Sequence, residues 1–253
     1  MYRKKKTKKN NVFQKKEDQM IGPNLNFSAK ESYNLLRTNI MLSLPNNGAC
    51  KVIGITSADA GEGKSTTAIN LSYSLSMNDK DVLLIEGDMR KPTISTRLGI
   101  EQKPGLSNLL AGLSSADIST HKSGISDRLT VLPAGDTPPN PSELLASEEM
   151  EKQIAEFKKT KDYIILDLPP INVVPDALVV ANIVDGMIII ARSDFAKKGA
   201  VADAIRQLEF GKVKILGFVL TNTSTENSTY RTYGKNYGKY HTYADHYYSS
   251  DGE

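Results

Sequence analysis

The sequence predicts an α/β fold in which helices cover both faces of a mostly parallel sheet. Short β-branched runs alternate with helix-length segments from Lys51 onward, which is the pattern of repeated βαβ units. Some of these runs, such as Met187 to Ile190, are apolar at every position, as expected of strands that are covered on both sides. The length of 253 residues, with 39% hydrophobic and 24% charged residues, fits one globular domain with tails better than two domains.

The expected elements follow from local patterns. Ser28 followed by Glu31 has the spacing of a capping box, so a helix is predicted from Ala29 to about Leu44, ended by Pro45. Six later runs are expected to form the strands of the sheet: 51–56, 81–86, 128–132, 163–167, 187–191 and 214–220.

The two ends of the chain differ in composition from the predicted domain, which is expected to span 28–222. Residues 1–16 hold eight Lys or Arg and no acid, which leaves 24 basic against 29 acidic residues elsewhere. We expect 1–27 to be a disordered basic tail; contact with anionic lipid headgroups is an alternative, and no nucleic-acid partner is expected. Residues 223–253 are expected to be a disordered tail rich in tyrosine, since they lack helical or strand periodicity.

Composition also excludes some classes of protein. The single cysteine, Cys50, cannot form an internal disulfide or a cysteine cluster, which fits a reducing compartment. No apolar run approaches the roughly 18 to 20 residues of a membrane-spanning helix, and the N-terminus lacks the apolar stretch of a secretory signal. A cytoplasmic location is therefore expected.

A glycine-containing loop follows the first expected strand and precedes a helical stretch. Its backbone N–H groups are expected to surround nucleotide phosphates, with Lys64 reaching the β and γ oxygens and Ser65 offering a hydroxyl to Mg²⁺. The strict phosphate-loop pattern begins with glycine where this chain has Ala58, a departure of one methyl group. The residues predicted to bind the nucleotide are Ala60, Gly61, Glu62, Gly63, Lys64, Ser65 and Thr66.

Carboxylates end two further strands. Glu86 and Asp88 follow one apolar run at i and i+2, and Asp167 ends another, immediately before two prolines. The carboxyl ends of parallel strands meet at the edge of the sheet where ligands bind, so these side chains are expected to face the phosphates. Mg²⁺ ligands are expected to be Ser65, Asp88 and Asp167. In the alternative interpretation, Glu86 and Asp88 only solvate the end of a strand.

These motifs, together with Pro138 to Leu145, resemble the bacterial tyrosine kinases of capsule and exopolysaccharide systems over residues 28–248. The family's second acidic motif, Asp-x-Asp-x-Arg-Lys-Pro, is here Glu86-x-Asp88-x-Arg90-Lys91-Pro92. The resemblance implies a P-loop NTPase fold, ATP and Mg²⁺ as cofactors, and catalytic functions for Lys64, Glu86 and Asp88.

The resemblance also implies assembly and autophosphorylation. The family's Glu-x-x-Arg-x-x-Arg motif supports subunit contacts in a ring; here it reads Glu31-x-x-Asn34-x-x-Arg37, which leaves Glu31 and Arg37 as predicted oligomer contacts or as ordinary surface charges. The tail tyrosines are predicted phosphoacceptors, with a sticky interaction segment as the alternative. They are Tyr230, Tyr233, Tyr237, Tyr240, Tyr243, Tyr247 and Tyr248.

Partners and location follow from the same resemblance. It implies a transmembrane activator of the chain-length-regulator type, which would place the protein at the inner face of the membrane, and also a tyrosine phosphatase and polysaccharide-synthesis enzymes. Two other functions stay open: a partitioning or division-type ATPase, and a nucleotide-gated assembly module without kinase activity. Asp59 disfavours the first, because that class resembles Lys-Gly-Gly-x-Gly-Lys and has its first lysine at this position.

Overall fold

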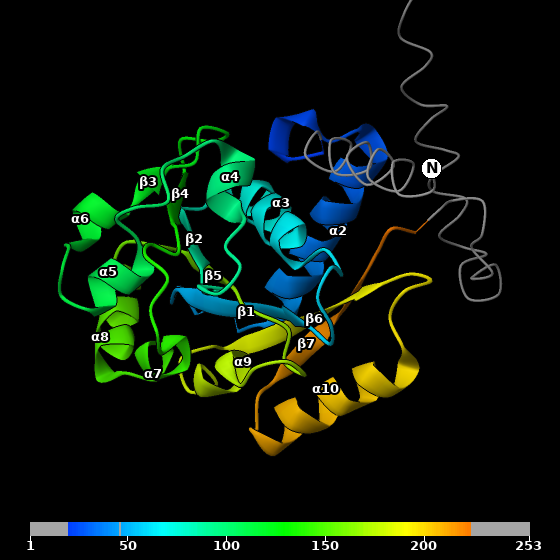
Figure 1. The fold of residues 1–253 in the computed structure, drawn as a ribbon. Helices are drawn as coiled ribbons and strands as arrows, with labels where there is room; N and C mark the ends of the chain where they lie inside the picture. Colours follow the sequence, from blue (N-terminus) through cyan, green and yellow to red (C-terminus); the bar gives the residue numbers. More distant parts are fainter. Residues whose placement is uncertain (1–19, 46, 224–253) are drawn as a thin grey trace, which may run out of the picture. The chain divides into compact units, whose positions relative to one another are not determined.

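The computed structural model describes residues 20–45 and 47–223. Within them, one sheet has the strand order β3-β4-β2-β5-β1-β6-β7, and only β3 is antiparallel to its neighbour (Figure 1). The strands are β1 Lys51–Ser57, β2 Val82–Glu86, β3 His121–Lys122, β4 Leu129–Leu132, β5 Tyr163–Asp167, β6 Gly186–Arg192 and β7 Ile215–Thr221. The helices are η1 Gly22–Asn24, α2 Phe27–Ser43, α3 Lys64–Ser76, α4 Ile94–Leu98, α5 Leu106–Leu110, α6 Ala116–Ser119, α7 Pro141–Leu145, α8 Glu148–Phe157, α9 Asp176–Val179 and α10 Lys198–Phe210.

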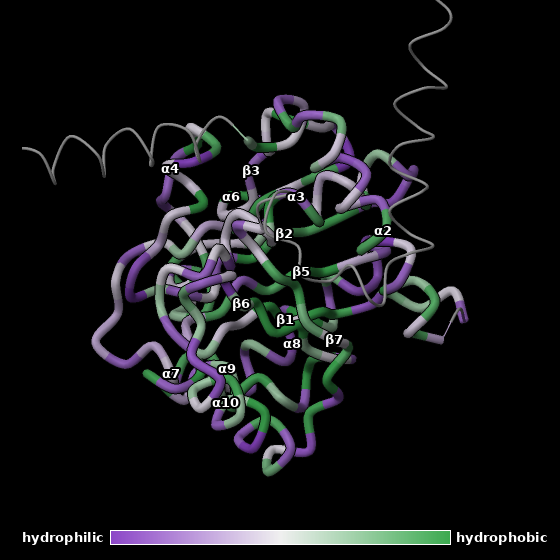
Figure 2. Tube along the Cα trace, turned by 90° about the vertical axis from the view of Figure 1, so that its right-hand side faces the viewer, coloured by the Kyte–Doolittle hydropathy of each residue, from purple (hydrophilic) through white to green (hydrophobic). Residues whose placement is uncertain are grey.

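Helices cover both faces of the sheet, which confirms the predicted fold class. Side chains alternate along each strand, so Leu83 and Leu84 of β2 enter different apolar cores. One core packs against α2, α3 and α4, and the other against α8, α9 and α10, on the opposite face of the sheet (Figure 1). Hydrophobic residues accordingly concentrate along the central strands β1, β5 and β6 (Figure 2).

The predicted strands form with ends that differ by at most one residue, but β3 was not predicted. His121 and Lys122 pair with Val131 and Thr130 of β4 at the edge of the sheet. Two residues are too few to show any periodicity in the sequence. Among the described helices, none is long and apolar enough to cross a membrane.

The cap of α2 differs from the one expected. Asn26 is the N-cap, and its side chain accepts a hydrogen bond from the Ala29 amide at 2.9 Å. Ser28 lies inside the helix, so the predicted capping box at Ser28 and Glu31 was wrong. Asparagine at 26 caps the helix two residues earlier than expected, and the helix still ends before Pro45.

The folded part also begins earlier than residue 28. Ile21 and Leu25 are buried, and the Asn70 side chain of α3 holds the backbone between them. Its Oδ1 accepts from the Gly22 amide at 2.9 Å, and its Nδ2 donates to the Met20 carbonyl at 3.1 Å. Residues 20–27 therefore pack with the domain, while the remainder of the expected basic tail lies outside the described residues.

The two hydrogen bonds of Asn70 to the backbone of Gly22 and Met20 give a stability prediction. Asn70→Ala should lower the free energy of unfolding by about 2 kcal/mol, because it removes two hydrogen bonds from a side chain that is 1% exposed. Chemical denaturation followed by circular dichroism measures this. Asn39→Ala, an exposed asparagine inside α2, is the matched control, since both changes alter helix propensity equally. Equal effects at the two positions would show that the hydrogen bonds of Asn70 do not stabilise the domain.

Candidate functional site

The loop between β1 and α3 has the backbone of a phosphate-binding loop. Gly61 and Gly63 have φ values of +83° and +95°, a left-handed backbone conformation that residues other than glycine rarely adopt. Gly63 is also the N-cap of α3, and Lys64 is the first residue of that helix. Successive amides at such a turn form an anion-binding concavity at the positive end of the helix. The conformation is therefore the one expected for nucleotide phosphates.

Ala58 stands where the strict motif has glycine, and the structure accommodates its methyl group. The side chain is fully buried and belongs to the core that packs against α8, α9 and α10. The departure therefore places a methyl group in an apolar environment and leaves the turn at Gly61 and Gly63 unchanged.

Glu62 was predicted to bind nucleotide, but its side chain serves the loop itself. It is fully buried, and Oε2 accepts a hydrogen bond from the Asp59 amide at 3.1 Å. The Ser57 hydroxyl donates to the Asp59 carbonyl at 2.6 Å, so both polar groups of the Asp59 backbone are held. The part of Glu62 that remains available to phosphate is its backbone amide.

Asp167, at the end of β5, is a buried carboxylate, and one of its oxygens lacks a hydrogen-bond partner among the described residues. Burial raises the pKa of Asp167 to about 7, against the lowering effects of a hydrogen bond from Ser65 and of the nearby Lys64 cation. Oδ1 is buried and has no hydrogen-bond partner in the described part of the chain. Asp167 beside Ser65 therefore fits a ligand for a bound cation.

The donor set suits Mg²⁺ bound together with a nucleotide. Among residues 20–45 and 47–223, no group of three or more His, Cys, Asp or Glu is placed to hold a metal ion. Such a group is not required, because Mg²⁺ in nucleotide sites takes one or two carboxylates and receives its other ligands from phosphates and water. Ser65 and Asp167 supply a hydroxyl and a carboxylate of this kind.

Asp88 joins this site through the backbone. The Gly87 and Asp88 amides donate to the Asp167 carbonyl at 2.8 and 3.1 Å, which draws the segment after β2 against the end of β5. Burial raises the pKa of Asp88, while the Lys91 amide, which donates to Oδ1 at 3.0 Å, and the Lys64 cation act in the opposite direction. The structure thus brings together Lys64, Ser65, Asp88 and Asp167.

Glu86 does not share the environment of Asp88. It is fully buried, and its Oε1 accepts hydrogen bonds from the amides of Thr93 and of Ile94, the latter at 2.6 Å. Its Oε2 accepts from the Ala134 amide at 3.3 Å. The expectation that Glu86 and Asp88 point to one side assumed that the strand continues, whereas β2 ends at Glu86. Glu86 therefore ties the start of α4 to the segment after β4.

The contacts of Arg90 place Asp176 in the site, although the sequence did not predict it. Its guanidinium donates to both carboxylate oxygens of Asp176, at 3.2 and 3.3 Å, and to the Ser142 hydroxyl at 3.0 Å. Ser142 in turn donates to Asp176 at 2.5 Å. This network connects the acidic motif after β2 to the Pro138 to Leu145 segment. Asp176 is fully buried, and its only signal in the sequence is an acid that follows proline.

The predicted oligomer contacts lie on α2. Glu31 is exposed and accepts a hydrogen bond from Asn34 at 3.0 Å. Arg37 instead points to α3, where it donates to the Ser74 carbonyl at 2.7 Å and to its hydroxyl at 3.2 Å. Arg37 thus has partners within its own chain. All seven predicted phosphoacceptor tyrosines lie outside the described residues.

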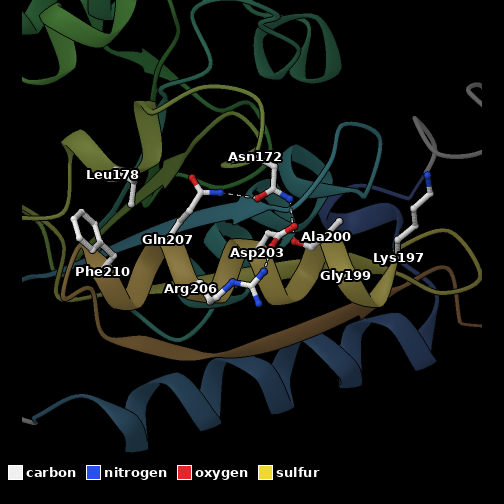
Figure 3. A pocket seen from close by; sticks show the side chains of 9 residues that line it. All are labelled: Asn172, Leu178, Lys197, Gly199, Ala200, Asp203, Arg206, Gln207 and Phe210. Carbon is white, nitrogen blue, oxygen red and sulfur yellow. Dashed lines mark hydrogen bonds and ion pairs between the residues drawn. The ribbon is translucent and has the colours of Figure 1, made fainter.

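A separate pocket of about 860 Å³ lies along α10 and contains none of the predicted site residues (Figure 3). The Asn172 side chain donates to the Ala200 carbonyl at 2.9 Å and accepts from Gln207 at 2.8 Å. Asp203 pairs with Arg206. These four polar side chains thus have partners within the domain.

Comparison with known proteins supports this assignment. The family described as AAA domain matches residues 50–214. The tyrosine-protein kinase CpsD of Streptococcus agalactiae is 37% identical over 211 residues, which make up 83% of this chain and 90% of that protein. The tyrosine-protein kinase YwqD of Bacillus subtilis is 38% identical over 205 residues, 81% of this chain and 86% of that protein.

Solved structures agree with these relatives. The kinase domain of the Escherichia coli tyrosine kinase ETK gives a TM-score of 0.74 at 28% identity, and the match covers 81% of this chain and 82% of that chain. The family match over residues 50–214 includes the glycine loop and the carboxylates that the structure gathers around Lys64. From its site and from these relatives, the chain belongs to the family of bacterial tyrosine-protein kinases.

Proposed function

We propose that the protein is a Mg-ATP-dependent protein-tyrosine kinase that phosphorylates the C-terminal tyrosine cluster of neighbouring subunits and regulates capsule or exopolysaccharide synthesis. The observation that carries the proposal is the convergence of Lys64, Asp88 and the buried carboxylate of Asp167 beside a glycine loop at the start of a helix. Named tyrosine kinases among its relatives support this activity over the partitioning-type ATPase alternative.

Each group has a distinct task in this proposal. The amides of 61–66 and the Lys64 ammonium bind the ATP phosphates, and Ser65 and Asp167 hold the metal. A bound Mg²⁺ supplies positive charge that stabilises the transferring phosphoryl group. The oxygen of the incoming tyrosine bonds to the γ-phosphorus as ADP leaves, and Asp88 accepts the proton of the tyrosine hydroxyl. Arg90 fixes the acidic motif through Asp176.

The assembly and location are proposed on the resemblance to the capsule-system kinases. A transmembrane activator would hold the protein at the inner face of the membrane, with a tyrosine phosphatase and polysaccharide-synthesis enzymes as further partners. Subunit contacts would use the exposed Glu31, because Arg37 is bound to Ser74 within the chain.

Incubating the purified protein with γ-labelled ATP and Mg²⁺, with and without the activator's cytoplasmic segment, tests the proposal. Replacing all seven tail tyrosines with phenylalanine should reduce phosphate incorporation to background while ADP affinity stays unchanged, because only acceptor hydroxyls are removed. The change therefore acts on the phosphoacceptor and leaves the nucleotide site intact. Mass spectrometry of the wild-type product locates the phosphates.

The matched control for this substitution is Tyr73→Phe, in the last turn of α3. It removes a tyrosine hydroxyl from the folded domain and should leave incorporation at the wild-type level. Full incorporation into the seven-phenylalanine variant would reject the tail as substrate, and ATP hydrolysis without phosphotyrosine in the wild-type protein would favour the partitioning-type ATPase.

A further inference from the structure

A phosphate-binding loop works only if its amide N–H groups, and not its carbonyl oxygens, face the phosphates. A trans peptide unit is planar, so the carbonyl of one residue and the N–H of the next point in opposite directions. A group that fixes a loop carbonyl on the outside therefore also fixes the following N–H on the inside. Such a group need not touch the nucleotide.

Two side chains from neighbouring strands bind the carbonyls of the glycine loop. The Thr221 hydroxyl donates to the Glu62 carbonyl at 2.7 Å, and Arg192 Nη1 donates to the Gly61 carbonyl at 3.4 Å. Consecutive peptide units of the loop are thus held from one side. Thr221 is the last residue of β7 and Arg192 the last of β6.

The sheet explains why these two residues reach the loop. In the pairing of β1 with β6, Ser57 lies opposite Ile190, so β6 continues beyond the point at which the loop leaves β1. Arg192 and Thr221 are then register partners in the β6–β7 pair, and the Ser193 amide donates to the Thr221 carbonyl at 2.9 Å. The backbone that carries both side chains is therefore fixed by strand pairing.

Packing at Gly63 shows how closely Thr221 approaches. A Cβ atom added to Gly63 would lie 3.2 Å from Thr221 Cγ2 and 3.3 Å from its Oγ1. The methyl group of Thr221 thus packs against the loop while its hydroxyl holds the Glu62 carbonyl. Arg192 is itself held, because its guanidinium lies 5.8 Å from the centre of the Phe195 ring.

The amides that follow these carbonyls are left available. In the part of the chain that the structure describes, the N–H groups of Glu62 and Gly63 have no protein acceptor. We propose that Thr221, assisted by Arg192, is a positioning residue that holds the Gly61 and Glu62 carbonyls outward and so directs these two N–H groups to the phosphates. The inference rests on the proposed nucleotide binding and deepens it.

The test compares Thr221→Val, which keeps the shape and loses the hydroxyl, with Thr221→Ser, which keeps the hydroxyl. With the full chain and Mg-ADP as the probe, Thr221→Val should raise the dissociation constant about fivefold, the scale of one neutral hydrogen bond. Thr221→Ser should restore most of the affinity. The KM for ATP should rise with little change in kcat, and the thermal midpoint without nucleotide should stay close to the wild-type value.

Thr130→Val is the matched control, because Thr130 also donates from a strand to a backbone carbonyl, that of Val82 at 3.3 Å, but on β4. It should leave Mg-ADP affinity unchanged. Arg192→Met should weaken binding less than Thr221→Val, since its contact is longer.

Wild-type affinity in Thr221→Val would overturn the inference, and so would a loss that Thr221→Ser does not rescue. A lower thermal midpoint together with an equal loss in Thr130→Val would assign Thr221 to strand stability and overturn it as well. Failure of the wild-type protein to bind Mg-ADP would instead contradict the proposed function on which the inference rests.

Discussion

Replacing Lys64 with methionine is expected to lower the rate of tyrosine phosphorylation by about a hundredfold to a thousandfold, the loss typical of removing one group that stabilises charge in a transition state. Lys64 is 8% exposed at the first position of α3, and its cation lowers the pKa of both Asp88 and Asp167. No other Lys or Arg acts on both carboxylates in this way in the described part of the chain. Initial rates of label transfer from γ-labelled ATP measure the loss.

The same variant should change stability little, by about 1 kcal/mol, because methionine keeps the length of the side chain and Lys64 forms no close ion pair among the described residues. Lys198→Met is the matched control: it is also the first residue of a helix, α10, but is exposed. It should leave the rate unchanged. Phosphorylation by Lys64→Met at the wild-type rate would show that the glycine loop does not take part in the reaction.

The sequence predicted those parts of the fold whose signal is local. Apolar runs located six of the strands, and the carboxylate at the end of one of them, Asp167, was placed correctly beside the loop. The packing of residues 20–27 was missed because Ile21 and Leu25 are isolated apolar residues, and because Asn70, which binds the backbone of Met20 and Gly22, lies almost fifty positions away. No periodicity in the sequence records a contact of that kind.

The same distinction applies to the site. The glycine loop was predicted because it is continuous in the sequence. Asp176 binds Arg90 from the start of α9, and Thr221 binds the Glu62 carbonyl from the end of β7, so both act from positions far along the chain. Thr221 acts on the loop through its carbonyl groups, and a single threonine at the end of an edge strand carries no motif. Glu86 shows the converse case: its motif position predicts catalysis, a prediction that still awaits a test, while its observed hydrogen bonds all go to backbone amides.

Replacing Glu86 with methionine is expected to lower the free energy of unfolding by about 3 kcal/mol, which for a domain of this size is on the order of 10 °C in the thermal midpoint. Three backbone amides, those of Thr93, Ile94 and Ala134, would lose their acceptor at a fully buried position. Burial raises the pKa of Glu86, so removing the carboxylate also relieves a desolvation penalty, and this offsets part of the loss.

The graded variants separate structure from catalysis. Glu86→Gln keeps one acceptor oxygen for Thr93 and Ile94 and turns an amide donor toward Ala134, so its loss of stability should lie between those of wild type and Glu86→Met. Asp88→Asn is the matched control and should show the reverse pattern: little change in the thermal midpoint and a large loss of phosphorylation, because Asp88 is less buried than Glu86 and lies beside Lys64. Calorimetry and label transfer on the same preparations measure both quantities. If Glu86→Gln kept the wild-type midpoint but lost activity as completely as Asp88→Asn, Glu86 would belong to the reaction, and its three hydrogen bonds would describe only the resting state of the site.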